Sequence, residues 1–497
     1  MGNAPAQTGP QIAIIGAGFS GICLGIQLRQ AGIRSFTIYE KADGLGGTWR
    51  DNRYPGAECD IQAFQYCFSF EQKTDWSAKW VGWAEILDYM EHCARKYELG
   101  PHLRFRTEIE SARWNEPESI WEIRSTAGEE IQAEILVSGV GQLNRPKIPE
   151  VPGLGSFAGD SFHSARWNAD CDITEKNVGV IGNAASAIQF IPEIAKQVKS
   201  LTVFQRSANW MLPRGNRAFT EKEKQRFTRF PILARTYRSL LWALQESQFP
   251  AFIGNSWLSR RMERFATRKM REQIRDPELA RALVPDYPIG ARRILISDDY
   301  YPTLLRENVE VVLEPIDRVT PEGIVTRDGQ TRRFDAIILA TGFETTAFLS
   351  PMKIEGRDGK SLTETWKAGA EAYLGISVAG FPNFFLMYGP NTNLGHNSII
   401  FMIECQTRYI LDCLRQLRER KLRSIDVRGS VMEAFNRRVL VELGQSVWAA
   451  TDHSWYKQAD GRITNNWSGS TLRYWWNTRH ADLMLYDRRS SPGQSDP

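Results

Sequence analysis

Two glycine-rich segments, each followed at the same distance by a charged residue, carry the clearest chemical signal in this 497-residue sequence. The first segment contains Gly16, Gly18 and Gly21, and Glu40 stands 24 positions after Gly16. Glycines at this spacing let the backbone approach a pyrophosphate at a helix N-terminus, whose partial positive charge favours the anion. The Glu40 carboxylate would accept hydrogen bonds from ribose hydroxyls. This segment therefore predicts a dinucleotide site.

The second segment, Gly182-Asn183-Ala184-Ala185-Ser186-Ala187, places a base where the first places an acid. Arg206 stands 24 positions after Gly182, and Ser207 follows it. A guanidinium beside a hydroxyl suits a 2′-phosphate, which a carboxylate would repel. We therefore expect FAD or NAD at the first segment and NADP at the second. Ala184 replaces a glycine that permits close backbone approach, so a second domain that has lost its nucleotide is the alternative.

The elements that must position these segments have the pattern of two doubly wound parallel sheets. Short apolar runs at residues 12–15 and 36–39 flank the first glycine segment, and runs at 177–181 and 201–205 flank the second. Helical patterns fill the intervals, including one near residues 185–198. The predicted fold class is α/β, with two Rossmann-like dinucleotide-binding domains and a helical insertion in the second.

Composition limits the class of protein. The net charge of +4 is small for this length and gives no support for nucleic-acid binding. The seven cysteines include no Cys-x-x-Cys pair and the six histidines no pair at ligand spacing, so we expect neither a metal site nor a redox dithiol. The N-terminus lacks a signal-peptide pattern, and no apolar run reaches the roughly 20 residues of a membrane span. We expect a cytoplasmic enzyme, a monomer or a homodimer.

The insertion, residues 216–288, is rich in Lys, Arg and aromatic residues. Its apolar residues recur at helical spacing: Leu233, Tyr237, Leu240, Leu241 and Leu244. We expect helices packed onto the second domain. The alternative is a basic amphipathic surface in peripheral contact with lipid.

A segment between the two nucleotide units resembles the fingerprint of the class B flavin monooxygenases, specifically the Baeyer–Villiger monooxygenases. It matches at Phe157, Gly159, His163 and Trp167, and departs only at Asn168, where the family has Pro or Asp. Further blocks are similar to the family's, from about residue 12 to residue 486. They are Gly46-Gly47-Thr48-Trp49, Asn52–Ala57 with Cys59-Asp60, Ala340-Thr341-Gly342-Phe343, Gly389-Pro390-Asn391-Thr392 and Ser454-Trp455-Tyr456.

This resemblance implies a division of the chain. Residues 10–150 form the first part of an FAD-binding domain, and residues 151–338 an NADP-binding domain that carries the insertion. Residues 339–488 return to the FAD-binding domain and add a C-terminal loop, and residues 489–497 form a disordered tail.

The resemblance also implies the residues of the site. Those expected at FAD, besides the first glycine segment and Glu40, are Gly47, Thr48, Trp49, Asp60, Tyr66, Ile109, Thr341, Gly342 and Asn391. Those expected at NADPH are Gly182, Ala184, Ser186, Arg206, Ser207, Arg292 and Trp455, the last on a loop that closes over the nucleotide.

Two residues are expected to be catalytic. In the family an arginine follows a lysine before a strand-like segment, and here Arg292 and Arg293 occupy those places. Arg293 would stabilise a peroxide anion, because an anion in a dry site needs a fixed positive charge and arginine keeps its proton. Asp60 would orient Arg293. His163 is expected to bond to backbone, and His396 to be a structural or flavin-neighbouring residue.

The function implied is an FAD- and NADPH-dependent conversion of ketones to esters or lactones with O2, through a C4a-peroxyflavin. Two other activities stay open: a class B enzyme that oxygenates nitrogen or sulfur, and an NADPH oxidase or reductase type of flavoprotein. The missing dithiol disfavours the reductase. Which ketone is converted is not encoded in any motif.

Overall fold

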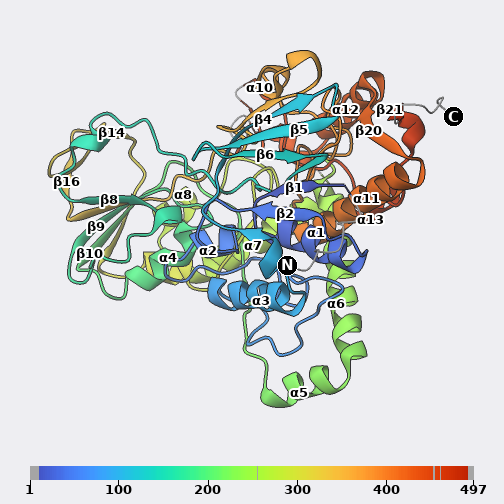
Figure 1. The fold of residues 1–497 in the computed structure, drawn as a ribbon. Coiled ribbons are helices and arrows are strands. Elements are labelled where there is room, and N and C mark those ends of the chain that lie inside the picture. Colours follow the sequence, from blue (N-terminus) through green and yellow to red (C-terminus); the bar gives the residue numbers. More distant parts are fainter. Residues whose placement is uncertain (1–9, 255, 452–453, 459, 491–497) are drawn as a thin grey trace.

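The first parallel sheet combines strands from the first 140 residues with one strand from the last third of the chain; β1 (Ile12–Ile15) and β2 (Phe36–Tyr39) mark it in Figure 1. The computed structural model describes residues 10–254, 256–451, 454–458 and 460–490. Within it, five parallel strands form the first sheet, in the order β19 (Phe384–Leu386), β7 (Ile135–Ser138), β1 (Ile12–Ile15), β2 (Phe36–Tyr39) and β3 (Leu103–Arg104). A strand from residues 384–386 therefore completes a sheet that begins at residue 12.

The second parallel sheet belongs to the middle of the chain and lies to the left in Figure 1. Its order is β13 (Val309–Val312), β10 (Ser200–Phe204), β9 (Asn177–Ile181), β17 (Ala336–Leu339) and β8 (Asp160–His163). All residues of β1 and β17 are buried, as apolar strands of a parallel sheet covered on both faces should be. The predicted fold class is confirmed, and the predicted strand at 201–205 begins one residue earlier.

Helices cover the sheets and fill the connections. Those of the first sheet's side are α1 (Phe19–Gln30), α2 (Thr48–Asp51), α3 (Trp83–Lys96), α10 (Leu362–Thr365), α11 (Ile399–Glu419), α12 (Gly429–Gly444) and α13 (Thr471–Asn477). The second sheet is covered by α4 (Ala187–Ile194) and α9 (Tyr300–Leu304). Because α1 and α4 each begin directly after a glycine segment, their N-termini point at the carboxyl ends of the strands, where open α/β sheets bind ligands.

Smaller sheets complete the molecule. They are β18 (Lys353–Glu355) with β4 (Ile109–Asn115), β5 (Ile120–Ser125) and β6 (Glu130–Ala133); β14 (Ile316–Thr320) with β15 (Gly323–Thr326) and β16 (Thr331–Arg333); β20 (Leu422–Val427) with β21 (Tyr486–Ser490); and β11 (Met211–Leu212) with β12 (Leu295–Ile296). The last pair is parallel and joins residues on either side of the insertion.

The insertion is helical, as predicted, but its packing differs from the prediction. It contains α5 (Glu221–Arg229), α6 (Pro231–Glu246), α7 (Trp257–Gln273) and α8 (Pro277–Ala282). The core of the first domain includes Leu241 of α6 and Phe252, whereas Met270 of α7 joins the core of the second. The insertion thus bridges the two domains, because its apolar residues face two cores and not only the second.

The C-terminal strand corrects the predicted start of the tail. Arg489 and Ser490 belong to β21, where they pair with β20, so the ordered chain continues two residues beyond residue 488. Residues 491–497 lie outside the described residues. Over the described part of the chain, no helix has both the length and the apolar character needed to span a bilayer.

Candidate active site

Both glycine segments open into one cavity between the two parallel sheets. The cavity has a volume of about 2460 Å³, and its walls include Gly16, Glu40, Gly182 and Arg206. A pocket for a single small ligand measures roughly 300–1,000 Å³. The cavity is therefore large enough for two dinucleotides and a further small molecule.

The first glycine segment forms a cradle of bare backbone. Gly16 has φ +101°, and its N–H donates to the carbonyl of Tyr39 at 2.8 Å. A Cβ on Gly21 would lie 2.0 Å from the Gly16 carbonyl oxygen, and a Cβ on Gly47 would lie 3.2 Å from the Cα of Gly18. Because glycine lines both sides of this cradle, a phosphate can reach the backbone N–H groups at the start of α1.

Glu40 is tied to the same segment. Its carboxylate accepts the N–H of Ala17 on one oxygen at 2.8 Å and the N–H of Ala42 on the other at 2.9 Å. The residue is 8% exposed and lines the cavity. A carboxylate has about four acceptor sites, so after these two bonds it can still accept from ribose hydroxyls. The geometry fits an adenosine ribose beside the pyrophosphate cradle.

The second glycine segment has the same backbone arrangement as the first, except that Ala184 stands where the first has Gly18. Gly182 has φ +110°, and a Cβ there would lie 2.5 Å from the Ala340 carbonyl oxygen, next to Thr341 and Gly342. Ala184 is exposed and lines the cavity. Its methyl group therefore occupies space in front of α4 where a glycine would leave the backbone bare.

Two arginines give this end of the cavity a positive charge suited to a phosphate, and a serine adds a hydroxyl. Among the described residues, the Arg206 side chain has no hydrogen-bond or ion-pair partner, and it is exposed. Arg292 donates to the Ser207 hydroxyl at 2.9 Å and lies 4.3 Å over the Tyr287 ring. Its Nε is buried without a partner. Such an unsatisfied donor fits an anionic ligand, because an unpaired buried N–H is costly.

Arg293 and Asp60 meet across the domain boundary at the cavity wall. The Arg293 Nε donates to Asp60 Oδ2 at 2.8 Å, and a terminal guanidinium nitrogen donates to the same oxygen. The attraction of Asp60 raises the pKa of Arg293, so the guanidinium stays charged. About a third of the Arg293 side chain, 36%, remains exposed toward the cavity. This is a permanent cation held in place by one carboxylate.

Two tyrosines next to this pair were not identified from the sequence. Tyr388 and Tyr456 both line the cavity, and burial raises the pKa of each. They remain neutral hydrogen-bonding groups beside the cation. Tyr456 lies in the Ser454-Trp455-Tyr456 block and was within reach of sequence analysis. Tyr388 precedes the Gly389 block and carried no signal of its own.

The fingerprint residues lie away from the cavity and build the second domain. His163 ends β8, accepts the N–H of Ala165 on Nδ1 at 3.0 Å, and lies 6.0 Å from the Phe343 ring. Burial lowers the pKa of His163, so the ring is neutral. Phe157 and Trp167 pack into apolar clusters, and a Cβ on Gly159 would lie 2.4 Å from the Asp335 carbonyl oxygen. The hydrogen bond of His163 to the Ala165 backbone is the kind of contact that the sequence suggested for this histidine.

Most of the predicted binding residues come together at the cavity, and two do not. The residues that line it are Gly16, Gly18, Glu40, Gly47, Thr48, Trp49, Asp60, Tyr66, Ile109, Gly182, Ala184, Ser186, Arg206, Ser207, Arg292, Arg293, Thr341, Gly342 and Trp455. Gly21 instead lets α1 pass close to Gly16. Asn391 is buried and donates to the carbonyls of Ile463 and Asn466 at 3.1 Å, so it secures the C-terminal loop.

His396 lies at the cavity wall on the side of the insertion. Its side chain is 1% exposed, and Nε2 lies 3.4 Å from Glu246 of α6. Burial opposes ionisation of Glu246, but hydrogen bonds from His396, Thr471 and Asn397 outweigh it and lower the pKa of Glu246 to about 2. This cluster fastens α6 to the C-terminal part of the chain, which agrees with the structural role expected for His396.

Fold and site together define a class: an oxidoreductase with two dinucleotide sites, one acidic and one basic at the ribose, that face each other across a fixed cation. Comparison with known proteins gives the family. The model of the flavin-binding monooxygenase-like family matches residues 9–355. A Baeyer–Villiger monooxygenase of Pseudomonas aeruginosa is 42% identical over 484 residues, which cover 97% of this chain and 92% of that protein.

Solved structures agree with this result. An oxidized steroid monooxygenase bound to NADP has a TM-score of 0.87 and 31% identity, over 97% of this chain and 100% of that one. A structure of OTEMO in complex with FAD and NADP has a TM-score of 0.86 and 28% identity, over 98% and 100%. The chain belongs to the flavin-binding monooxygenase-like family and, within it, to the Baeyer–Villiger monooxygenases.

The cradle predicts a test of flavin binding. Gly21→Ala places a methyl group 2.0 Å from the Gly16 carbonyl, so the segment must move. We expect flavin bound per chain after gel filtration to fall at least about tenfold, because pyrophosphate contacts depend on this backbone. Gly100→Ala is the control, since a Cβ there meets nothing within 4 Å. Full flavin retention in the Gly21 variant would contradict the assignment.

Proposed function

We propose that this cavity binds FAD along the first glycine segment and NADPH along the second, and that Arg293 is the catalytic residue. The chain is an NADPH-dependent flavin monooxygenase of the Baeyer–Villiger type, which converts ketones to esters or lactones with O2. The single observation that carries the residue assignment is the Arg293–Asp60 pair on the cavity wall. When bound, FAD would supply the redox chemistry, with NADPH as hydride donor and O2 as the oxidant.

The residues of the first domain would hold and orient FAD. The cradle of Gly16, Gly18 and Gly47 fits the pyrophosphate, and Glu40 fits the ribose hydroxyls. The Trp49 Nε1–H donates to the Tyr66 hydroxyl at 3.2 Å, so these two side chains line the cavity as a bonded pair. We assign residues 10–150 and 339–488 to this domain, because β19 completes the sheet that β1 begins.

The residues of the second domain, 151–338, would hold NADPH. Arg206, Ser207 and Arg292 provide two guanidinium groups and a hydroxyl for the 2′-phosphate. Thr341 and Gly342 lie where the chain leaves this domain, and Trp455 lies on the C-terminal loop, fixed through its carbonyl by the Thr345 hydroxyl at 2.6 Å. This hydrogen bond would hold the Trp455 loop beside a bound NADPH.

Arg293 would serve the oxygen-insertion step by keeping its positive charge. Asp60 would neutralise part of that charge and set the direction of the guanidinium, and Tyr388 and Tyr456, whose pKa values are raised by burial, would remain protonated beside it. Preorganised charge of this kind stabilises a developing anion without reorganisation at the moment of reaction. Arginine suits the role because it cannot act as an acid near neutral pH.

The setting of the enzyme is proposed from its surface and its cysteines. All seven cysteines are free thiols, which fits the reducing cytoplasm. We propose a monomer or a homodimer. We further propose that the insertion contacts lipid, since it exposes Ile232, Leu240, Leu244, Ile253 and Trp257, each more than half exposed. Exposed arginines 260, 261, 264 and 268 follow Trp257 along α7.

Replacement of Arg293 tests the catalytic assignment. We expect Arg293→Ala to bind FAD and to be bleached by NADPH, but to lose ester formation by at least about 100-fold, as removal of a single oxyanion-stabilising donor does. Product is measured by mass spectrometry with cyclohexanone, acetophenone and 2-decanone. Arg318→Ala, on β14, is the control, because its side chain is 56% exposed and paired with Asp317. Unchanged ester turnover in the Arg293 variant would refute the role.

Replacement of Arg206 tests the choice of nucleotide. We expect Arg206→Ala to raise the KM for NADPH by about 10- to 100-fold, because a hydrogen bond to a charged group contributes about 1.5–3 kcal/mol. NADH lacks the 2′-phosphate and serves as the internal control, so its KM should change little. Steady-state rates with both nucleotides give the comparison. Equal changes for the two would mean that the phosphate binds elsewhere.

Sedimentation with vesicles tests the lipid contact. We expect the enzyme to sediment with vesicles of phosphatidylglycerol and to remain in solution with vesicles of phosphatidylcholine, because arginine on α7 favours an anionic surface. Trp257→Ala combined with Arg261→Glu should reduce sedimentation several-fold. The Arg318→Ala variant should behave as the unmodified enzyme. Sedimentation that is equal for both lipids and all variants would exclude this surface.

A further inference from the structure

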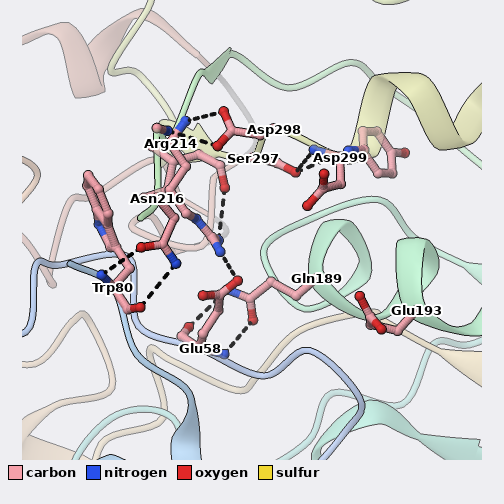
Figure 2. A network of polar contacts seen from close by, with 12 residues as sticks. Glu58, Trp80, Gln189, Glu193, Arg214, Asn216, Ser297, Asp298 and Asp299 are labelled. Carbon is pink, nitrogen blue, oxygen red and sulfur yellow. Dashed lines mark hydrogen bonds and ion pairs between the residues drawn. The ribbon is translucent and has the colours of Figure 1, made fainter. Parts of the chain in front are cut away.

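A second arginine–carboxylate pair lies beside Arg293 and Asp60. Arg214 pairs with Glu58, two residues before Asp60, and its side chain is only 8% exposed (Figure 2). Arg214 comes from the second domain and Glu58 from the first. Both residues line the same boundary as the catalytic pair, but neither carried a sequence signal. A charge buried this far needs a fixed partner.

Arg214 and Arg293 are positioned by one short ladder. Arg214 follows β11 by two residues, Arg293 precedes β12 by two residues, and β11 and β12 pair in parallel. The ladder is extended by the N–H of Ser297, which donates to the Leu212 carbonyl at 3.1 Å. The two arginines therefore lie at opposite ends of the β11–β12 ladder. Their partners, Glu58 and Asp60, lie on either side of Cys59. The two pairs therefore share both a ladder on the arginine side and a three-residue segment on the carboxylate side.

The Arg214 end of this ladder is firmly held. The N–H groups of Arg214 and Gly215 donate to the two carboxylate oxygens of Asp298 at 2.9 and 2.8 Å, and the Arg214 guanidinium donates to the Ile296 carbonyl at 3.1 Å. Asn216 exchanges two hydrogen bonds with the backbone of Trp80, at 3.2 and 3.1 Å. Figure 2 shows Arg214 between Asp298 and Glu58. The guanidinium therefore has a fixed origin in the second domain.

Gln189 of α4 holds Glu58 from the other side. Its side-chain amide donates to the Glu58 carbonyl at 2.9 Å and accepts from the Tyr54 hydroxyl at 2.8 Å. At Gly56 the chain passes so close to α4 that a Cβ would lie 2.5 Å from the Gln189 carbonyl oxygen. Segment 54–60 is thus clamped between α4, which begins at the second glycine segment, and the β11–β12 ladder.

We propose that Arg214 is a positioning residue for oxygen insertion: through Glu58 it locks segment 54–60 onto the second domain and so sets the place of Asp60 against Arg293. This inference rests on the role proposed for Arg293. Loss of the lock leaves each nucleotide site intact but lets the catalytic pair shift. A shift of about 1 Å can cost on the order of 100-fold in a step that depends on orientation.

The test measures how NADPH consumption divides between ester and hydrogen peroxide in the FAD-loaded enzyme. We expect Arg214→Met to be reduced by NADPH at a rate close to that of the unmodified enzyme, while ester formed per NADPH falls about tenfold and peroxide rises to match. Arg214→Lys keeps the charge and should recover part of the ester yield. The ketone is whichever of cyclohexanone, acetophenone and 2-decanone the unmodified enzyme converts fastest.

Two further variants separate positioning from general damage. Arg217→Met is the matched control, because this arginine lies on the same loop but is 48% exposed and paired with Glu223. Glu58→Gln is made alone and together with Arg214→Met. If the two residues act as one unit, the ester yield of the double variant should be no lower than that of the less productive single variant. A merely structural role would lower reduction and ester formation in parallel and leave their ratio unchanged.

The outcomes are distinguishable from failure of the proposed function. If Arg293→Ala keeps ester turnover, the catalytic assignment itself fails. If Arg293→Ala loses ester formation while Arg214→Met and Arg214→Lys keep the unmodified ester-to-peroxide ratio, only the positioning role is overturned. If Arg214→Met does not fold, the ester-to-peroxide ratio of Arg214→Lys tests the positioning role. A lysine ammonium is too small to bond Glu58 and the Ile296 carbonyl at the same time, as the arginine guanidinium does.

Discussion

Arg293 and Asp60 come from different domains, and their ion pair ties the chemistry of the cavity to the way the domains are joined. A guanidinium in a partly closed site needs a carboxylate nearby, or its burial would be unfavourable. The carboxylate cannot surround it, or no charge would be left for an anion. The structure meets both conditions. One oxygen of Asp60 accepts from two guanidinium nitrogens of Arg293, and 36% of the Arg293 side chain remains exposed.

The two nucleotide sites show how one fold unit serves two ligands. Each has a strand, a glycine segment with a left-handed first glycine, a helix and a second strand. The difference lies in single side chains: Glu40 after β2 and Arg206 after β10. Glu40 is buried and bonded to its own loop, whereas the Arg206 side chain projects without a partner in the described structure. A carboxylate can be preorganised for hydroxyls, but a phosphate-binding cation must remain free until its ligand arrives.

How much of this the sequence could predict depends on whether an interaction is local. Each glycine segment is joined to its charged residue by a short βαβ unit, so the spacing predicted the strands and helices around Gly16 and Glu40 and around Gly182 and Arg206. Arg214 and Glu58 are 156 positions apart in the chain, and although Glu58 lies within the block that ends at Asp60, nothing local indicated that it pairs with Arg214. The prediction of how the insertion packs was wrong for the same reason. The spacing of its apolar residues predicted helices, but that spacing does not indicate which of the two cores the helices contact. The sequence likewise did not indicate that the Asn391 amide bonds the carbonyls of Ile463 and Asn466, because these residues are more than 70 positions away.

The insertion contributes apolar side chains to the cavity wall. The cavity is lined there by four residues of the insertion: Leu241, Leu244, Phe252 and Met262. On the same side, Glu246 of α6 contacts His396 and Thr471. The cofactor cradles are constrained by backbone geometry and by charge, so they tolerate little change. Apolar side chains on a bridging insertion can vary in size without disturbing either cradle. A change in the size of these four side chains would therefore alter the shape of this wall while the two cradles and Arg293 keep their places, and no motif in the sequence encodes that shape.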